Sequence, residues 1–416
     1  MNKRALAAFV SFASLWCVSA ARAQSFGERG FIQGGGFFFP DTTQKDSTQV
    51  VGDLLVRDEG FVKPTSWLQF AAGFDLRANS HDQVDSSWSP DFTDRGTLRP
   101  RVSVRRLNAT ITHGPLTLDL GKQFIRWGKT DIVTPTDRFA PRDFINVTDN
   151  DFLAVSGARG VFQWKSNTFD AVWVPQLTPS RIPLLNQRWT SVGLAATTPL
   201  VDGGAVFPSG SETGLRWSHT GRGYEFAASY FNGFNHLPNI TPQPVFAPNG
   251  VPIAARIFRT YPTLRMYGLD AAVPTPWFTI KGEAAYSTTT TAATDEYVIY
   301  VVQLERQIRE WDLVGGYAGE DVTHSGGAAN FAPDRGLARS FLARASYTID
   351  PNRTAALETA IRQNGHGLVV KGEFSQARGQ HWRASMTASL IRGDADDFLG
   401  QYRLNSHVAL ALRYSF

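Results

Sequence analysis

Charged side chains of both signs crowd the segment from residue 121 to residue 144, GKQFIRWGKTDIVTPTDRFAPRDF. The segment starts as an alternating strand over 116–125 and then mixes ionic groups with prolines and aromatic rings. A lipid-facing strand cannot carry such charges, and a flexible loop does not need charges, prolines and aromatic rings in this density. We therefore expect a structured loop held by internal ion pairs. The candidate residues are Arg126, Trp127, Lys129, Asp131, Asp137, Arg138, Arg142 and Asp143.

The chemistry that suits such a loop is the selection of ions and small polar solutes in a narrow passage. We expect residues 126–143 to fold into a lumen as a constriction, with Trp127 as an anchor and Gly128 allowing a sharp backbone turn. Five charged residues would form an eyelet of both signs, namely Asp131, Asp137, Arg138, Arg142 and Asp143. The alternative is a rigid external cap with internal salt bridges and no role in transport.

Arginines form a second group of candidate residues. Arg99, Arg101 and Arg105 share one side of a predicted strand with Ser103. An arginine that faces the middle of a bilayer costs about 2–4 kcal/mol, so the three are expected to face a wet interior. A column of cations would favour anions, unless carboxylates pair with these arginines and they only hold the wall together. Arg106 breaks the alternation and predicts a bulge.

The elements that position these groups are predicted from the last residues of the chain. Alternation over 403–416 puts one set of residues on one side of an extended strand, and an aromatic end suits the border between hydrocarbon and headgroups. That set is Leu404, Ser406, Val408, Leu410, Leu412, Tyr414 and Phe416. The ending resembles the carboxy-terminal signal of bacterial outer-membrane barrels, which the barrel-assembly machinery reads. Taken alone, the pattern would also suit the last strand of a soluble sandwich.

The same alternation recurs along the whole chain. It is clear over 68–77, 278–287, 298–305, 355–362, 368–375 and 382–390. Short turn signals alternate with long connections, as in an antiparallel transmembrane barrel with short periplasmic turns and long outer loops. We therefore predict an all-β, up-and-down barrel of about 18 strands, with about 16 as the alternative count, and both termini on the periplasmic side.

The amino terminus predicts secretion. Lys3 and Arg4 precede an apolar stretch over 5–18, and Ala21-Arg22-Ala23 has the form of a cleavage site, so 1–23 is the expected signal peptide and 24–416 a single barrel domain. The only cysteine, Cys17, lies in this signal. Cleavage leaves 38 basic and 37 acidic residues. A net charge of +1 gives no reason to expect a nucleic-acid partner.

A resemblance to known barrels comes from the segment described first. The chain resembles a group of poorly characterised proteobacterial porin-like barrels, related in style to the alginate-export family, in which a strand ends G-[KR]-Q-x-x-x-W-G before spaced Asp and Pro-x-(x)-Asp elements. The matching residues are Gly121, Lys122, Gln123, Trp127, Gly128, Lys129, Asp131, Pro135, Asp137, Pro141 and Asp143. The resemblance implies an outer-membrane barrel. We expect such a barrel to contact lipid and lipopolysaccharide and to be a monomer or a trimer. It leaves the solute unspecified.

The function that we expect is passive diffusion of small solutes, with anions favoured. One alternative is a dedicated channel that exports an acidic polysaccharide or takes up an apolar or aromatic compound. Another is a non-conducting barrel that binds a partner and has its lumen filled by loops. The 8 histidines are scattered, and neither G-x-S-x-G nor H-E-x-x-H occurs, so we expect no enzyme activity, metal or cofactor.

Overall fold

The computed structural model describes residues 25–190 and 198–416. Within them, an 18-stranded antiparallel sheet closes into a barrel where β1 pairs with β23. Its strands are β1 (Ser25–Phe38), β2 (Val50–Thr65), β3 (Leu68–Asn79), β4 (Val102–His113), β5 (Leu116–Gln123), β8 (Val155–Trp164), β9 (Asn167–Val174), β11 (Glu212–Gly221), β12 (Tyr224–Phe234), β15 (Thr263–Pro274), β16 (Thr279–Thr288), β17 (Glu296–Ile308), β18 (Trp311–His324), β19 (Ser340–Asp350), β20 (Arg353–Arg362), β21 (Gly367–Arg378), β22 (Trp382–Gly393) and β23 (His407–Ser415). The predicted signal peptide, 1–23, and the predicted mature start, Gln24, lie outside the described residues.

Two-residue alternation gives the wall its two faces. On β17, Tyr300, Val302 and Leu304 are exposed on the outside at 41%, 52% and 45%. Their neighbours Ile299 and Val301 are buried inside. This outer apolar row and inner packed or polar row are the pattern that a barrel wall in lipid requires. The predicted number of about 18 strands is confirmed.

The last strand starts later than the sequence predicted. Residues 400–405 form a 3₁₀ helix, η1 (Gly400–Asn405), and β23 begins at His407. Leu404 and Ser406 therefore do not belong to the outward row. The reason is tertiary, because Tyr402 of this helix is buried against Trp189, with ring centroids 5.5 Å apart, and this contact draws the chain off the extended path.

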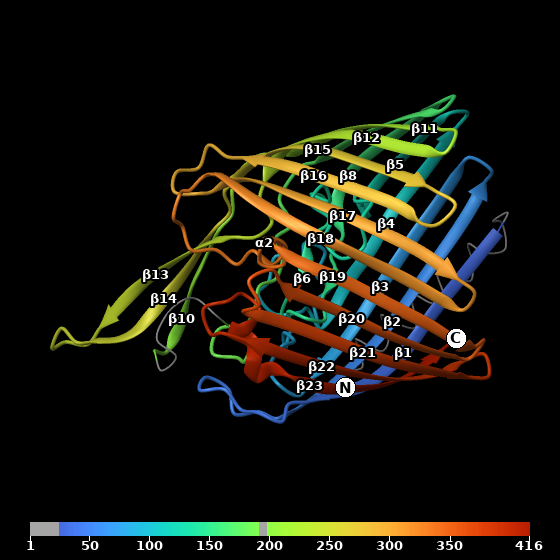
Figure 1. Cartoon of the computed structure of the whole chain (residues 1–416). Helices are drawn as coiled ribbons and strands as arrows, with labels where there is room; N and C mark the ends of the chain where they lie inside the picture. The colour runs from blue at the N-terminus through green and yellow to red at the C-terminus, as the bar shows by residue number, and fades with distance from the viewer. Residues whose placement is uncertain (1–24, 191–197) are drawn as a thin grey trace.

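The two ends of the barrel differ, as Figure 1 shows. Adjacent strands are joined at one end by turns such as 66–67, 114–115, 165–166 and 309–310, and the described termini, Ser25 and Phe416, lie at this end. The other end carries the long connections, including 80–101, 124–154, 175–211 and 235–262. Alternating short turns and long loops, predicted from sequence, are confirmed.

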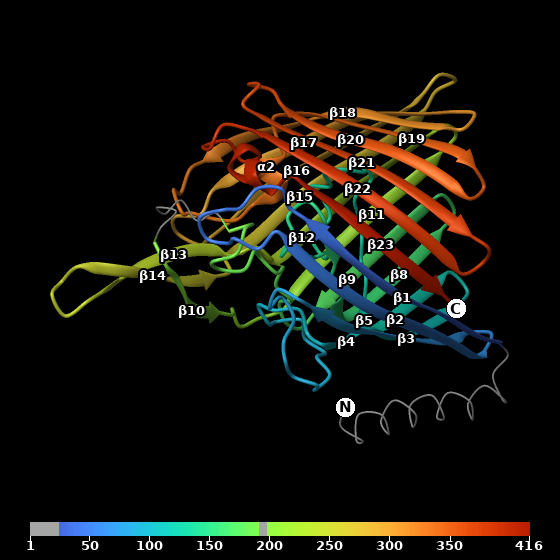
Figure 2. The same ribbon diagram turned by 90° about the horizontal axis from the view of Figure 1, so that it is seen from below.

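The long loops contain further secondary structure. A small sheet of β10 (Leu200–Val206), β13 (Asn239–Phe246) and β14 (Pro252–Thr260) projects beyond the barrel (Figure 2). A short helix, α2 (Pro333–Gly336), lies in the loop between β18 and β19. The pair β6 (Arg142–Asp143) and β7 (Asp151–Phe152) lies in the loop between β5 and β8. Among the described residues, no helix is both long enough and apolar enough to cross a membrane.

The buried core lies inside the barrel, where the loop 124–154 meets the inner wall. Phe139 of this loop packs with inward residues of β12 and β15, among them Phe231 and Met266. Val133 packs with Ile299 and its neighbours on β17 to β20. The loop between β5 and β8 is therefore folded into the lumen, as the sequence predicted.

Candidate functional site

Glu283, an inward residue of β16, holds the tip of the inserted loop. Its Oε2 accepts hydrogen bonds from the backbone N–H groups of Lys129 and Thr130, at 2.8 and 3.0 Å, and from the Thr130 hydroxyl at 2.8 Å. Its Oε1 accepts from the N–H and the hydroxyl of Thr136, both at 2.8 Å. Five donors thus surround a carboxylate that is 3% exposed, a charge-assisted clasp between loop and wall.

The other end of the loop reaches the opposite wall. Asp151 of β7 lies 3.6 Å from Arg77 on β3 and 3.8 Å from Arg57 on β2. Through successive strand pairings, β2 and β16 are nine steps apart in either direction round the 18-stranded sheet, so they face each other across the lumen. The loop 124–154 therefore spans the interior and divides it.

Trp127 packs the first part of the loop against the wall. Its Nε1–H donates to Asp170 of β9 at 2.9 Å. Its ring meets Phe139 edge-on, with centroids 5.2 Å apart, and Phe139 meets Phe231 of β12 in the same way at 5.0 Å. The Trp127 side chain is buried among these groups, which is the position that an anchor would occupy.

Gly128 has a different role from the one predicted. It is not among the described residues with a positive φ, so it does not supply a left-handed turn. A Cβ at this position would lie 2.7 Å from Cβ of Thr134. Gly128 is thus required by close packing within the loop, because any larger residue would push Thr134 away from the turn that surrounds Glu283.

Two members of the predicted eyelet are buried and cannot line a wet passage. Asp143 accepts two hydrogen bonds from Arg99, at 2.9 and 3.0 Å, and lies 3.3 Å from Arg181. Burial by itself would raise the pKa of Asp143, but these two guanidinium groups hold it well below its usual range. Asp137 accepts from Nε of Arg126 at 2.9 Å, and burial raises its pKa despite that partner. Both carboxylates stabilise the loop itself.

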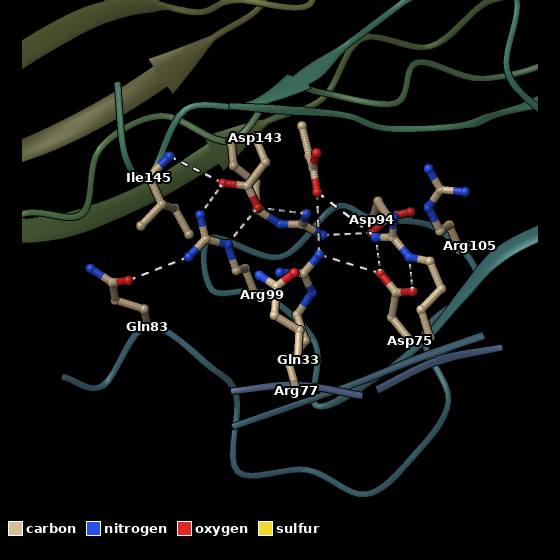
Figure 3. A network of polar contacts seen from close by, with 12 residues as sticks. Gln33, Asp75, Arg77, Gln83, Asp94, Arg99, Arg105, Asp143 and Ile145 are labelled. Carbon is tan, nitrogen blue, oxygen red and sulfur yellow. Dashed lines mark hydrogen bonds and ion pairs between the residues drawn. The ribbon is translucent and has the colours of Figure 1, made fainter. Parts of the chain in front are cut away.

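Asp143 belongs to a buried ionic network that joins three loops (Figure 3). Arg181 also donates to Asp94 at 2.6 Å, and Asp94 binds Lys122 of the sequence motif. These residues come from loops 80–101, 124–154 and 175–211 and from the end of β5. The network fixes the long loops relative to one another, and this explains the density of charge in the sequence without any contact to a solute.

The remaining loop charges divide into two kinds. Arg138 donates from Nε and Nη2 to the carbonyl of Pro135, at 2.9 and 2.7 Å, and so closes a turn. Arg142 lies 4.3 Å from the ring centroid of Phe152 and is also held within the loop. Solvent still reaches the side chains of Arg126 (45%), Lys129 (29%) and Asp131 (44%). Lys129 pairs with Glu225, and Asp131 pairs with Lys281.

The prediction that Arg99, Arg101 and Arg105 share one strand is wrong. β4 begins at Val102, so Arg99 and Arg101 precede it. Arg99 binds Asp143, whereas Arg101 lies at the exposed rim, where its Nε donates to the carbonyl of Asp85. Arg105 alone belongs to β4, and it donates to Glu59 of β2 at 2.6 Å. The predicted bulge is confirmed, since the register between β3 and β4 slips at this position.

A different set of arginines gathers on the inner wall and was missed as a group. Arg413 of β23 donates to Gln33 of β1, and the register pairs it with Arg383 of β22. Arg57 of β2, Arg77 of β3 and Arg105 of β4 lie on the next three strands beyond β1. The members are Arg57, Arg77, Arg105, Arg383 and Arg413. Arg105 was expected to face the wet interior as part of the ladder, but its grouping with Arg413 was not predicted, because only closure of the barrel brings the first and last strands together.

The predicted targeting residues lie at the short-turn end. Phe416 donates its N–H to the carbonyl of Gly30 at 3.0 Å and accepts from the N–H of Gly30 at 3.2 Å, which completes the seam between the first and last strands. Its ring is half exposed. Tyr414 meets the ring of Trp382 edge-on, with centroids 5.0 Å apart. Among the residues that the structure describes, no three His, Cys, Asp or Glu side chains cluster as metal ligands.

Comparison with known proteins gives a fold. No protein-family model matches the chain, and no curated protein matches its sequence. A BenF-like porin from Pseudomonas fluorescens Pf-5 has a similar structure, with a TM-score of 0.56, 9% identity and coverage of 95% of this chain and 99% of that one. For OccAB4 from Acinetobacter baumannii the TM-score is 0.54 and the identity 9%, with coverage of 95% of this chain and 99% of that one. For the outer membrane protein opdK from Pseudomonas aeruginosa the TM-score is 0.52 and the identity 10%, with coverage of 95% of this chain and 99% of that one. The chain therefore has the fold of these barrels.

Proposed function

We propose that the protein is an outer-membrane channel for the passive diffusion of small solutes, with a preference for anions. An outer surface with apolar rows on β17 and β23 suits insertion in a bilayer. The shared fold with a BenF-like porin and with OccAB4 supports this reading. In this role the barrel is not an enzyme and needs no cofactor. The link between the W-G loop motif and the alginate-export family stays a prediction.

The proposed orientation puts the short turns and both termini in the periplasm and the long loops outside. After removal of the signal peptide, 1–23, residues 24–416 would form the mature barrel. Its outer surface would contact lipid and lipopolysaccharide. Tyr414 and Phe416 would be read by the barrel-assembly machinery. A monomer and a trimer both remain compatible with this arrangement.

Solvent access to charges inside the barrel is the observation that carries the proposal. Asp151 has a side chain that is 63% exposed although it lies on the loop that crosses the lumen. Asp131, near the opposite wall, is 44% exposed. A barrel filled by its loops would cover both carboxylates with protein atoms, and neither would stay accessible to solvent. Solvent-accessible carboxylates at both ends of the loop support a passage on either side of it.

The preference for anions is inferred from the arginine group. Five arginines, namely Arg57, Arg77, Arg105, Arg383 and Arg413, come from adjacent strands on one arc of the wall. The carboxylates that pair with them are Glu59, Asp75 and Asp151. Because cations outnumber acids on this arc, the local potential is positive and would attract anions. The passage would still be lined by charged side chains of both signs, but these are other residues than those of the predicted eyelet.

Planar bilayer recording tests the proposal. Purified, refolded protein should give discrete conductance steps, and a salt gradient should give a reversal potential displaced toward that of chloride. The double variant Arg77→Gln, Arg413→Gln should lose most of that displacement. Arg353→Gln removes an arginine of a short turn, where it pairs with Asp350, and should behave as the wild type. Absence of conductance in correctly folded protein would favour the non-conducting alternative.

A further inference from the structure

A cavity of about 480 Å³ lies among the long loops, outside the segment 121–144. Its lining comes from the loops 80–101, 175–211 and 235–262, which include β10 and β14. Apolar side chains make up much of the wall, among them Leu184, Leu185, Leu200, Phe207, Ile257 and Tyr261. The volume falls within the range of small-molecule sites, and the mostly apolar lining is also typical of them.

One wall of this cavity is aromatic. The rings of Phe207 and Tyr261 lie nearly parallel, with centroids 5.4 Å apart and planes 9° apart. The guanidinium carbon of Arg95 lies 5.0 Å from the centroid of Phe207. The edges of these rings can contact an apolar ligand, while the guanidinium that lies over Phe207 can bind a negative group.

The polar part of the lining is basic. Arg95 donates from Nε and Nη2 to the carbonyl of Leu177, at 3.1 and 3.0 Å, and these bonds fix its position and leave further N–H groups. Arg259 is oriented by Asp202 at 2.6 Å. Arg181 is 4% exposed, and its Nε has no hydrogen-bond partner within the described part of the chain. The acids in the lining are Asp82 and Asp202, so cations predominate.

The cavity is also held in shape before any ligand arrives. Asn186 donates from Nδ2 to the carbonyl of Leu200 at 2.7 Å and accepts from the Leu200 N–H at 3.0 Å. This pair of bonds joins two parts of the lining that are 14 residues apart. Arg181 is fixed in turn by Asp94 and Asp143. A preformed site loses less entropy on binding than one that must be ordered by its ligand.

We propose that this cavity binds a small organic anion with an aromatic or aliphatic body. The apolar part would lie against Phe207, Tyr261 and the leucines, and the anionic group would face Arg95 and Arg259. The site lies at the long-loop end, and binding there does not depend on whether the lumen conducts. The inference therefore stands separately from the proposed channel function.

Isothermal titration calorimetry on the detergent-solubilised full chain tests this inference, with naphthalene-2-carboxylate and its neutral carboxamide as probes. The carboxylate should bind in saturable fashion, and the carboxamide about tenfold more weakly, because it lacks the charge-assisted bonds. Leu184→Trp should fill the cavity and abolish binding. Arg259→Gln should weaken binding of the carboxylate and leave that of the carboxamide unchanged.

Val251→Trp adds the same ring at an exposed turn residue outside the cavity and should bind as the wild type does. Equal heats for Leu184→Trp and wild type would mean partition into detergent and would overturn the site. Equal affinity for the two probes would overturn the assignment of an anion. Bilayer conductance of Leu184→Trp, measured in parallel, separates the two proposals. An intact current together with lost binding would show that the cavity binds the probe and that conduction does not depend on it.

Discussion

Thr136 donates both its backbone N–H and its hydroxyl to the same carboxylate oxygen of Glu283, each at 2.8 Å. The two residues are 147 positions apart in the chain. Glu283 belongs to the wall of the barrel, and Thr136 belongs to the loop that crosses its interior. This contact fixes how far the loop extends into the lumen and therefore how the interior is divided.

Replacing Glu283 by Ala should release the tip of the loop. Loss of the shared acceptor leaves several buried donors without a partner, which costs about 3 kcal/mol or more. The midpoint of unfolding in urea should fall, and single-channel conductance should rise with more frequent fluctuations. Glu358→Ala removes another inward carboxylate, on β20, which makes no hydrogen bond or ion pair with the loop within the described residues, and should leave both quantities near the wild-type values. Unchanged conductance in a folded Glu283→Ala protein would argue against a constricting loop.

Asp151→Asn should increase the selectivity for anions. The carboxylate offsets the charges of Arg57 and Arg77, and its exposed position means that structure depends little on it. We expect the chloride-to-potassium permeability ratio to rise roughly twofold, because one negative charge leaves a confined passage. The reversal potential in a potassium chloride gradient measures this ratio. Asp350→Asn, on a short turn, is the matched control, and an equal shift there would point to surface charge instead.

Trp127 offers a graded test of how the loop is anchored. Trp127→Phe keeps a ring against Phe139 but removes the donor to Asp170, which should cost about 1 kcal/mol. Trp127→Ala also leaves a cavity and should cost about 3–5 kcal/mol. Equilibrium unfolding followed by fluorescence of the remaining tryptophans gives both values. Trp277→Ala, at a residue 67% exposed on a short turn, should cost much less, and an equal cost would contradict the anchoring role.

Acid should loosen the contact between two long loops through His236. Its Nδ1–H donates to the carbonyl of Thr178 at 2.6 Å, and Nε2 lies 3.5 Å from Glu212. Burial lowers the pKa of His236 to about 4, and the charge of Arg138 adds to this effect. The unfolded residue titrates near 6.5, so the stabilisation is complete above about pH 6.5 and is lost progressively as the pH falls toward 4, up to about 3 kcal/mol.

Hydrogen exchange of residues 175–190 and 235–238 between pH 4 and 8 measures the loosening at His236. After correction for intrinsic exchange rates, protection should fall with acid in the wild type. His236→Asn can still donate to Thr178 but does not titrate in this range, so its protection should depend less on pH. Parallel curves for the two proteins would assign the acid effect to other groups.

Removal of the terminal ring should impair assembly. Phe416→Ser keeps the two backbone hydrogen bonds with Gly30 and changes only the half-exposed side chain. We expect less folded barrel in outer-membrane fractions, together with normal stability of protein refolded in detergent. Heat-modifiable migration on gels reports folding in both preparations. Leu412→Ser, in the same outward row, separates the terminal signal from general loss of apolar surface.

Prediction from sequence succeeded for the wall because its signal is local. Alternation over 298–305 assigns Tyr300 and Val302 to one face and Ile299 and Val301 to the other, and a two-residue period needs no knowledge of neighbouring strands. Turn residues at 113–115 and 350–352 mark the ends of strands in the same local way. The length of β23 was overestimated because Tyr402 packs against Trp189, a contact between residues distant in the chain.

The sequence by itself determined an antiparallel barrel of about 18 strands, the loop between β5 and β8 as its charged insert, and Phe416 as an aromatic terminus. Tertiary structure alone decided which charges remain wet. Asp143 and Asp137 are buried by partners on the same and other loops, whereas Asp151, outside the predicted eyelet, faces Arg57 and Arg77. Closure of the sheet joins β23 to β1 and gathers arginines that are hundreds of residues apart, which no local period encodes.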